Sequence, residues 1–395
     1  MAFVVLGGGL AGVTAARTLR SLDGATAITI VEAEPTPYYL RPGLIEVLAG
    51  RKTLSEITPF PRAWFEHRRI AYRSGTPAVA LQPAAHRVQL ASGEVLTYER
   101  LLLACGAEAV QPDLPGVSVG GVFTLRSAAD VERIRTRAET VSAAAVIGGG
   151  WLGIEVARAL HDLGLAVVLL ERGPWLLNRQ LDAGAARVLQ EILVAQGIGV
   201  RVGAACQTIV GSTEVEAVRL ADGEEIAAGL VVISAGIRPR VGLALAAGLR
   251  TGQGVIVDDH LATSDPEIFA AGDVAEWRGR IYGIIPAARE QGELAARNMV
   301  EPGRATYSGT SPTNKLKVAG VDLLCLGNTQ PRGGSLREMR HADPSSGRYV
   351  KFVLGGDGEL AGAILLGAPE LAGPIEELAQ AGVPAEDDLQ RLLAS

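Results

Sequence analysis

The feature that most constrains the fold is a glycine-rich turn that occurs twice. Residues 3–19 read FVVLGGGLAGVTAARTL and residues 143–160 read AAAVIGGGWLGIEVARAL, so a short apolar run, three consecutive glycines and an amphipathic run follow one another in both places. A short apolar run bounded by glycines is typical of a buried strand, and apolar residues at helical spacing predict a helix. Each copy therefore predicts a strand that enters a helix through a tight turn.

Each copy continues into a second apolar strand. The predicted elements are a strand at 2–6, a helix at 10–21 and a strand at 27–31 in the first copy, and a strand at 143–147, a helix at 151–163 and a strand at 166–170 in the second. Continuous apolar strands that alternate with helices indicate parallel sheets covered on both faces. We therefore predict an α/β fold with two such units.

The rest of the chain follows the same duplication. Residues 88–106 and 218–236 each predict a hairpin with a Ser-Gly or Asp-Gly turn, followed by an apolar strand that runs into a glycine. The last segment lacks a glycine-rich turn and predicts a small α+β module of hairpin strands with trailing helices. The expected domains are a discontinuous one at 1–109 and 231–304, a second at 110–230, and a small C-terminal α+β domain at 305–395.

Composition excludes several classes of protein. The chain is 48% hydrophobic and 20% charged, and its net charge of −6 argues against a nucleic-acid partner, which requires an excess of Lys and Arg. No segment approaches the uninterrupted apolar run of about 18 residues that a membrane span needs. Cys105, Cys206 and Cys325 are far apart and form no CxxC pair, which favours a reducing compartment. We expect a soluble cytoplasmic protein without a metal site.

Both turns match the pattern G-x-G-x-x-G. The matching residues are Gly7, Gly9 and Gly12 in the first cradle, and Gly148, Gly150 and Gly153 in the second cradle. In this pattern the first glycine makes the turn, the second lets a pyrophosphate approach the backbone, and the third lets helix and strand pack closely.

An acid ends the second strand of each copy. These acids are Glu32 and Glu171, and a carboxylate at this position can accept hydrogen bonds from ribose hydroxyls. The alternative is a pair of packing turns with solvated glutamates. Because both units are complete, we favour two Rossmann-like dinucleotide-binding domains.

A third stretch, TSDPEIFAAGDVAE at residues 263–276, runs a short strand into Gly272 and Asp273. A carboxylate at the end of such a strand could bind a polyol, such as the ribityl chain of a flavin. Asp273 could equally be the N-cap of a helix. The stretch by itself leaves both interpretations open.

Taken together, the motifs carry a resemblance to a known family. They are VVLGGGLAG with IVEAE, PYYLRPGL, LLLACGA, VIGGGWLGIE, ISAGIRP, AAGDVAE, GIIPAAREQGELAARNM and TNKLKVAGVDLL. Over its whole length the chain resembles the FAD-dependent pyridine nucleotide-disulfide oxidoreductases, with their glutathione-reductase-type domains. Within them it is most similar to the NADH:rubredoxin oxidoreductases and the flavoprotein part of NAD(P)H nitrite reductases.

The resemblance implies FAD at the first cradle and NADH or NADPH at the second. It implies that Gly7, Gly9, Gly12 and Glu32 hold the ADP half of FAD and that Asp273 binds its ribityl chain. The other residues implied near a cofactor are Arg41, Pro42, Ala104, Gly106, Gly148, Gly150, Gly153, Glu155, Glu171, Gly236, Gly272 and Pro286. For Arg41 the alternative is a solvated loop charge, for Pro286 an ordinary proline at a helix start, and for Glu155 a first-turn acid favoured by the helix dipole.

The chain departs from the disulfide reductases in one segment. Residues 36–50, TPYYLRPGLIEVLAG, contain no cysteine, although in those relatives this segment carries the redox-active cysteines. Family members that have the Arg-Pro motif also have a lysine shortly after it, and Glu46 stands there instead. Cys105 is expected to be a small buried residue, and the alternative is a redox role in which Cys105 and Cys325 meet in the fold. We therefore expect flavin-centred chemistry with no catalytic side chain and no redox disulfide.

The expected function is an FAD-dependent NAD(P)H:acceptor oxidoreductase that reduces a small iron–sulfur or other electron-acceptor protein, such as rubredoxin. NADH should be preferred because Glu171 would repel the 2′-phosphate of NADPH, although the neighbouring Arg172 could attract it. The basic stretch RAWFEHRRIAYR, from Arg62 to Arg73, is either a solvated helix face or a docking patch for an acidic carrier. Two alternatives remain, an NADH oxidase that uses O₂ and an NADH-sensing subunit without turnover.

Overall fold

The computed structural model describes residues 2–311, 314–318, 320–331, 336–343, 346–383 and 385–394. Contacts within the chain divide it into two compact units. Unit 1 contains Met1–Leu44, Lys52–Ala109 and Gly236–Thr310, and unit 2 contains Ile45–Arg51, Val110–Ala235 and Ser311–Ser395. Each unit is therefore assembled from segments that are distant in sequence.

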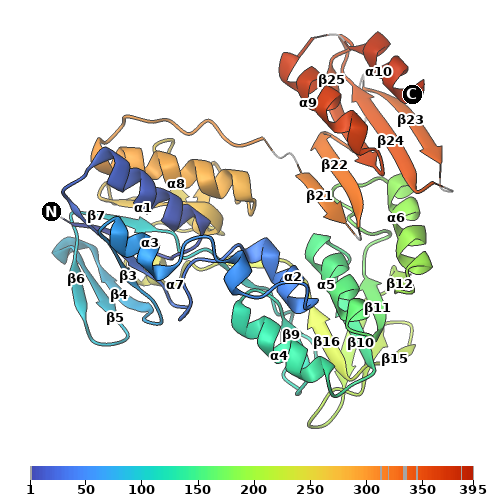
Figure 1. Cartoon of the computed structure of the whole chain (residues 1–395), viewed down its shortest axis with the longest axis horizontal. Helices are drawn as coiled ribbons and strands as arrows, with labels where there is room; N and C mark the ends of the chain where they lie inside the picture. The colour runs from blue at the N-terminus through green and yellow to red at the C-terminus, as the bar shows by residue number, and fades with distance from the viewer. Residues whose placement is uncertain are drawn as a thin grey trace. The chain divides into compact units, whose positions relative to one another are not determined.

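Unit 1 is built on a five-stranded parallel sheet. In spatial order its strands are β19 (Ile268–Ala270), β7 (Arg100–Leu103), β1 (Ala2–Leu6), β2 (Ala27–Val31) and β3 (Ile70–Arg73). Helix α1 (Leu10–Leu22) contacts β1 and β2, helix α8 (Ile285–Val300) contacts β19 and β7, and the two helices lie side by side (Figure 1). The apolar face of α1 buries its side chains in the core of this unit, which explains the helical spacing of apolar residues in the sequence.

Unit 2 contains a second five-stranded parallel sheet with the same plan. In spatial order its strands are β12 (Gly199–Val202), β11 (Ala166–Glu171), β10 (Ala143–Ile147), β16 (Leu230–Ile233) and β9 (Val122–Thr124). In both sheets the strand before the glycine turn is central, and the strand after the next helix lies beside it. The helices in contact with this sheet are α4 (Ala128–Ala138), α5 (Trp151–Asp162) and α6 (Ala183–Ala195).

The elements predicted from the two glycine-rich copies are present, with ends displaced by no more than one residue. The predicted hairpins are present as well, and each gains a third antiparallel strand. The two antiparallel sheets are β4 (Ala78–Gln82), β5 (Arg87–Leu90) and β6 (Val95–Thr97), and β13 (Cys206–Val210), β14 (Ala217–Leu220) and β15 (Glu225–Ala227). The duplication in the sequence is therefore a duplication of the fold.

The C-terminal part of unit 2 is an antiparallel sheet with two helices on one face (Figure 1). Its strands, in spatial order, are β21 (Asn314–Val318), β22 (Val321–Gly327), β25 (Leu360–Leu366), β24 (Arg348–Leu354) and β23 (Arg337–Asp343). Helices α9 (Ala372–Ala381) and α10 (Glu386–Ala394) share its apolar core, which includes Phe352, Ile375 and Leu389. The predicted α+β character of this segment is confirmed.

The remaining elements are short. They are α2 (Leu44–Leu48), α3 (Arg62–His67), α7 (Gly242–Ala246), the pair β8 (Ala107–Ala109) with β17 (Ile237–Pro239), and the pair β18 (Val255–Val257) with β20 (Ala275–Trp277). Within the described ranges, no helix combines the length and the apolar character that crossing a bilayer requires.

Two expected boundaries are displaced in the structure. The boundary expected between residues 230 and 231 falls inside β16, which is paired with β10 and β9, so the units meet at Ala235–Gly236 instead. Residues 305–310 belong to unit 1, because Tyr307 lies fully buried in its core. A strand that is hydrogen-bonded on both sides cannot be separated from its sheet, whatever the local sequence indicates.

Candidate functional site: two glycine-lined cradles

The first cradle is a turn that tolerates no side chain at its first and third glycines. Gly7 has a φ of +115°, and a Cβ built on it would lie 2.1 Å from the carbonyl oxygen of Ala104. A Cβ on Gly12 would lie 1.9 Å from the carbonyl oxygen of Gly7. A Cβ on Gly9, by contrast, would meet no described heavy atom within 4 Å. The open side of the turn is therefore at Gly9, which is also the N-cap of α1.

The second cradle repeats this geometry. Gly148 has a φ of +118°, and a Cβ on it would lie 2.2 Å from the carbonyl oxygen of Ser234. A Cβ on Gly153 would lie 1.8 Å from the carbonyl oxygen of Gly148, whereas Gly150, the N-cap of α5, faces open space among the described residues. Among the described residues, each cradle is thus open beside the N-cap of its helix, and the N–H groups of a helix N-terminus favour an anion.

The acid at the end of the second strand is held by the turn itself. Glu32 accepts hydrogen bonds from the Gly8 amide at 2.5 Å and from the Glu34 amide at 2.9 Å. Glu171 accepts hydrogen bonds from the Gly149 amide at 2.7 Å and from the Gly173 amide at 2.5 Å. Each carboxylate therefore has a defined orientation and keeps lone pairs for a ligand, since two carboxylate oxygens offer about four acceptor sites. This geometry argues against the interpretation of solvated glutamates.

The sheet topology of unit 1 brings three loops to the first cradle. Strands β19, β7 and β1 are parallel neighbours, so the loops that follow them leave from the same edge. These loops contain Gly272 and Asp273, then Ala104 and Gly106, then the glycine turn. A Cβ on Gly272 would lie 3.0 Å from the Cβ of Ala11 on α1. The turn that carries Asp273 is therefore packed against the start of α1.

Asp273 is not the N-cap of a helix. It lies within a single turn of 3-10 helix, Gly272–Val274, whose N-cap is Ala271. The turn is held by a residue that the sequence did not single out, because the amide of Gly272 donates a hydrogen bond of 2.8 Å to Oε1 of Gln291. Gln291 is 1% exposed and lies on α8. Its only signal in the sequence is its place in the motif GIIPAAREQGELAARNM.

Helix α8 begins where the sequence indicated. Ile284 is its N-cap, and Pro286 is its second residue, a position where the missing N–H costs nothing. A Cβ on Gly292 would lie 2.4 Å from the carbonyl oxygen of Ala11, so this glycine lets α8 approach α1 closely. The close approach holds Gln291 against the Gly272 turn.

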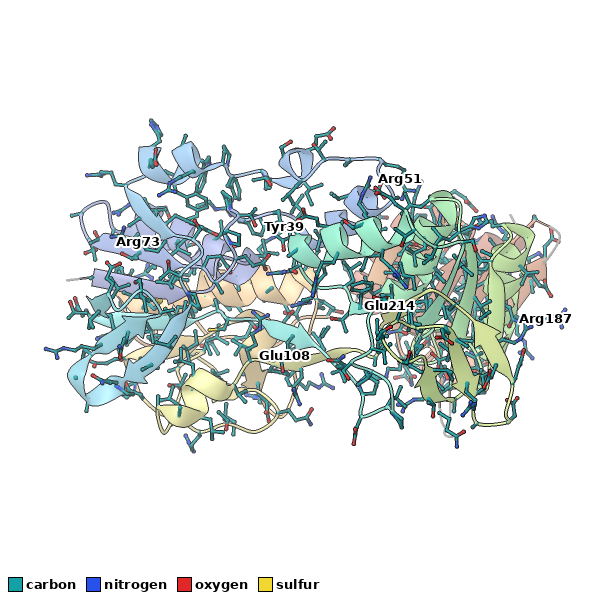
Figure 2. All side chains as sticks on the ribbon, turned by 90° about the horizontal axis from the view of Figure 1, so that it is seen from below. Tyr39, Arg51, Arg73, Glu108, Arg187 and Glu214 are labelled. Atoms are coloured by element: carbon teal, nitrogen blue, oxygen red, sulfur yellow. The ribbon has the colours of Figure 1, made fainter. Side chains whose placement is uncertain are left out.

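Arg41 is a partnered residue rather than a free loop charge. It lies with Pro42 in the turn Arg41–Gly43, and its Nη2 is 2.8 Å from Oε1 of Glu34. The hydroxyl of Tyr39, which is labelled in Figure 2, donates a hydrogen bond of 2.5 Å to the other oxygen of Glu34. Since Glu34 also donates its amide to Glu32, this network extends from Arg41 to the acid of the first cradle.

Residues 45–51, which follow this turn, contact helices α4 and α5 of unit 2. Glu46 pairs with Arg51 at 2.9 Å, and Arg51, also labelled in Figure 2, pairs with Asp162 at the end of α5. Arg135 on α4 donates a hydrogen bond of 2.8 Å to the carbonyl oxygen of Val47. These contacts explain why residues 45–51 belong to unit 2 although their neighbours in sequence belong to unit 1.

Glu155 and Gly236 complete the expected set. Glu155 is the fifth residue of α5 and lies beyond the first turn, so the alternative of a first-turn acid is wrong. Gly236 has a φ of +99°, and a Cβ on it would meet no described atom within 4 Å. It follows β16 as Gly106 follows β7, and the chain returns to unit 1 at this residue.

The three cysteines are free thiols. Burial raises the pKa of Cys105 to about 11 and the pKa of Cys325 to about 12, and it also raises the pKa of Cys206. Cys105 lies in unit 1, whereas Cys206 and Cys325 lie in unit 2. A thiol with a raised pKa is a poor nucleophile at neutral pH, because the thiolate is the reactive form.

The basic stretch serves the fold at several positions. Phe65 is completely buried, and the guanidinium of Arg68 lies 4.0 Å from the ring centre of Trp64. Arg20 on α1 donates hydrogen bonds of 2.9 Å to the carbonyl oxygens of Arg68 and Arg69. This turn precedes β3 and therefore lies at the edge of the parallel sheet opposite the first cradle. Arg73, labelled in Figure 2, lies at the carboxyl end of β3 and is exposed.

The residues present fit two dinucleotides. In each cradle the space beside the second glycine is open, which is where a pyrophosphate approaches the backbone. Beside the first and third glycines, backbone carbonyl groups lie so close that no side chain fits. Each cradle also orients one carboxylate beside a helix N-terminus.

Most of the chain matches two known protein families. Residues 1–292 match the pyridine nucleotide-disulphide oxidoreductase family. Residues 312–382 match the rubredoxin NAD+ reductase C-terminal domain. The first match covers both cradles and both parallel sheets.

Individual relatives agree with these families. NAD(P)H nitrite reductase of Bacillus subtilis (strain 168) is 34% identical over 365 residues, which are 92% of this chain and 45% of that protein, so the chain spans less than half the length of this relative. Rubredoxin-NAD(+) reductase of Pseudomonas putida is 32% identical over 335 residues, 83% of this chain and 86% of that protein. The solved structure of a NAD-dependent persulfide reductase from A. fulgidus superposes with a TM-score of 0.88 at 28% identity, and covers 98% of this chain and 78% of that one. The chain therefore belongs to the pyridine nucleotide-disulphide oxidoreductase family, whose members use FAD and a pyridine nucleotide.

Proposed function

We propose that the chain is an FAD-dependent NAD(P)H oxidoreductase that passes electrons from NADH to a small redox protein, such as rubredoxin, or to a partner of the nitrite-reductase type. The observation that carries the proposal is the duplicated cradle, one copy in each unit, with the same glycine and carboxylate geometry in both. Bound FAD supplies the redox chemistry, since it takes up a hydride and can release electrons one at a time. The protein supplies binding, orientation and electrostatics.

The first cradle is the proposed FAD site. The FAD-binding domain expected at residues 1–109 and 231–304 corresponds to unit 1, which contains Met1–Leu44, Lys52–Ala109 and Gly236–Thr310. Gly7, Gly9 and Gly12 admit the pyrophosphate to the N-terminus of α1, and Glu32 accepts hydrogen bonds from the adenosine ribose. The turn of Gly272 and Asp273 is packed against the start of α1, which supports a role for Asp273 on the ribityl chain. The residues proposed to line the flavin are Arg41, Pro42, Ala104, Gly106, Gly236 and Pro286. The N-terminus of α8 would favour negative charge on the flavin.

The second cradle is the proposed NADH site, in a domain near residues 110–230. Gly148, Gly150 and Gly153 admit the pyrophosphate to the N-terminus of α5, and Glu171 accepts hydrogen bonds from the adenosine ribose. Because Glu171 is oriented by two backbone amides, its charge cannot easily move away from a 2′-phosphate, which supports a preference for NADH. Glu155 is proposed to lie on the nicotinamide side of this cradle.

The proposed mechanism uses no disulfide. Residues 36–50 contain no cysteine, and the pKa of each of the three cysteines is raised, so none is prepared as a thiolate at neutral pH. Electrons would therefore leave directly from the flavin to the acceptor.

The acceptor is proposed to be a small iron–sulfur or similar carrier protein, and the location cytoplasmic. The name of the Pseudomonas relative, and the match to the rubredoxin NAD+ reductase C-terminal domain, support a carrier of this class. Docking at the stretch from Arg62 to Arg73 remains part of the proposal. Arg62 and Arg73 are exposed, although each lies 3.5 Å from a carboxylate, Arg62 from Glu66 and Arg73 from Glu94. Arg68 is packed on Trp64. The patch therefore attracts an acidic partner only with the charge that these pairs leave uncompensated.

Steady-state NADH consumption tests the proposal. Rapid oxidation that requires added rubredoxin or another small iron–sulfur protein supports the reductase, and equal rates in air without a carrier support an oxidase. A reduced complex that persists for many minutes with either acceptor supports a sensor. Cys105→Ser is the matched control for the disulfide-free mechanism and should retain carrier-dependent turnover.

A further inference from the structure

Tyr72 reaches the first cradle from strand β3. Its side chain is 7% exposed, and its hydroxyl has no hydrogen-bond partner in the described part of the chain. A Cβ built on Gly8 would lie 2.1 Å from this hydroxyl and 2.9 Å from Oε2 of Glu32. The hydroxyl therefore lies directly against the glycine turn, beside the carboxylate of the cradle.

A buried hydroxyl without a partner is unfavourable, because it gives up its hydrogen bonds to water and gains none in return. Burial raises the pKa of Tyr72, and Glu32 and Glu34 raise it further, so the group remains a protonated donor. In the described part of the chain this donor has no acceptor. The cradle beside it is a site for a ligand rich in acceptor oxygens, because the α1 N-terminus favours anions.

The internal duplication supplies a comparison. In unit 1, Tyr72 pairs in register with Ile30, two residues before Glu32. In unit 2, Val200 pairs in register with Leu169, two residues before Glu171. The equivalent of Tyr72 is therefore a valine, and a Cβ on Gly149 would meet Leu176 and Glu171 rather than a hydroxyl. The hydroxyl distinguishes the first cradle from the second.

We propose that the Tyr72 hydroxyl donates a hydrogen bond to an oxygen of the ribose–phosphate part of the adenosine half of FAD. This inference rests on the proposed assignment of FAD to the first cradle. The hydrogen bond satisfies the hydroxyl only when FAD is bound, so it contributes to retention of FAD and not to folding of the empty protein. Among the described residues the second cradle has no such group, and the dinucleotide proposed to bind there must leave in every turnover.

The test compares Tyr72→Phe with Tyr98→Phe in the full chain. Tyr98 is the matched control, because its hydroxyl is also buried without a partner in the described residues of unit 1. It precedes β7 and so lies at the opposite edge of the sheet from the cradle. Release of FAD on dilution is followed by flavin fluorescence. We expect Tyr72→Phe to raise the Kd for FAD about tenfold, the effect of one hydrogen bond to a polar or charged oxygen, and Tyr98→Phe to leave it unchanged.

A second readout separates binding from stability. The FAD-free melting temperature of Tyr72→Phe should equal or exceed that of the wild type, since the variant removes an unsatisfied buried group. Competition by ADP should weaken by the same factor as FAD binding, and binding of FMN, which lacks the adenosine half, should not change. An unchanged Kd for FAD, an equal loss in Tyr98→Phe, or an equal loss for FMN overturns the inference.

Failure of the proposed function gives a different result. If Gly9→Ala weakens FAD binding and Tyr72→Phe does not, FAD occupies the first cradle and only the role of Tyr72 is wrong. If neither variant changes FAD binding, the assignment of FAD to this cradle is wrong, and the inference about Tyr72 falls with it.

Discussion

Replacing the second or the third glycine of each cradle by alanine should separate glycines needed for folding from glycines needed for binding. At Gly12 and Gly153 the new Cβ would lie 1.9 Å and 1.8 Å from a backbone carbonyl oxygen, a distance that no rotamer change can relieve. At Gly9 and Gly150 the new Cβ would meet no described atom within 4 Å. The same substitution therefore has opposite consequences three residues apart.

The magnitudes follow from these distances. Overpacking against a rigid backbone costs about 3 kcal/mol, and a unit of this size loses roughly 2–4 °C of melting temperature per kcal/mol, so Gly12→Ala and Gly153→Ala should each lower a transition by about 10 °C. Gly9 and Gly150 have φ values of −73° and −81°, which alanine adopts without strain. Replacing glycine at an N-cap by alanine costs less than about 1 kcal/mol.

Cofactor binding should be impaired in Gly9→Ala and Gly150→Ala, the two variants whose stability changes little. The methyl group of Gly9→Ala would occupy the space that the pyrophosphate of FAD needs, so this variant should be isolated with much less than one FAD per chain. Gly150→Ala should keep its FAD and show a KM for NADH raised by about tenfold or more, as expected for the loss of about 1.4 kcal/mol or more of binding free energy.

The assay is thermal unfolding of the four variants without added cofactor, together with FAD content and NADH kinetics. Because the chain has two units, unfolding is followed by two probes rather than treated as a single two-state transition. The reasoning is refuted if Gly9→Ala unfolds as early as Gly12→Ala, or if it retains FAD as tightly as the wild type.

Three further predictions concern other parts of the chain. Glu171→Ala should lower the preference for NADH over NADPH, measured as the ratio of kcat/KM, and a wild type that favours NADPH would contradict the assignment of this acid. Anaerobic titration should bleach the flavin at two electrons per FAD in wild type and Cys105→Ser alike, whereas uptake of four electrons, lost in the variant, would reveal a redox disulfide. Lys351 is 2% exposed and pairs with Asp182 at 3.0 Å and Glu338 at 2.9 Å, so Lys351→Met should lower the free energy of unfolding in urea by about 3 kcal/mol, and a loss below 1 kcal/mol would show that the pair is not needed. Burial opposes ionisation of Asp182, but hydrogen bonds from Ala185, Tyr349 and Lys351 hold its pKa below the ordinary value, so this stabilisation is present above about pH 4 and is lost as the pH falls through the lowered pKa.

The local elements around both cradles could be predicted from the sequence alone. Backbone freedom and apolar spacing within about 20 neighbouring residues determine strand β1, the turn at Gly7 and the start of α1. Both properties can be read directly from the local sequence. The same holds for β10 and α5. For this reason the repeated glycine-rich turn was enough to predict the α/β class and the two matching cradles.

Tertiary structure decided what depends on residues distant in sequence. The boundary inside β16 is displaced because a strand belongs to the sheet with which it forms hydrogen bonds, and its partners β10 and β9 lie far from it in sequence. Gln291 belongs to one of the family motifs, but nothing in that motif indicates a contact with Gly272, and Tyr72 is one aromatic residue among several in a basic stretch. Their roles arise only when α8 brings an amide oxygen to Gly272 and when β3 brings a buried hydroxyl to Gly8. A hydrogen bond requires two groups close together in space. The local sequence shows each group separately, but only the tertiary structure shows whether the two meet.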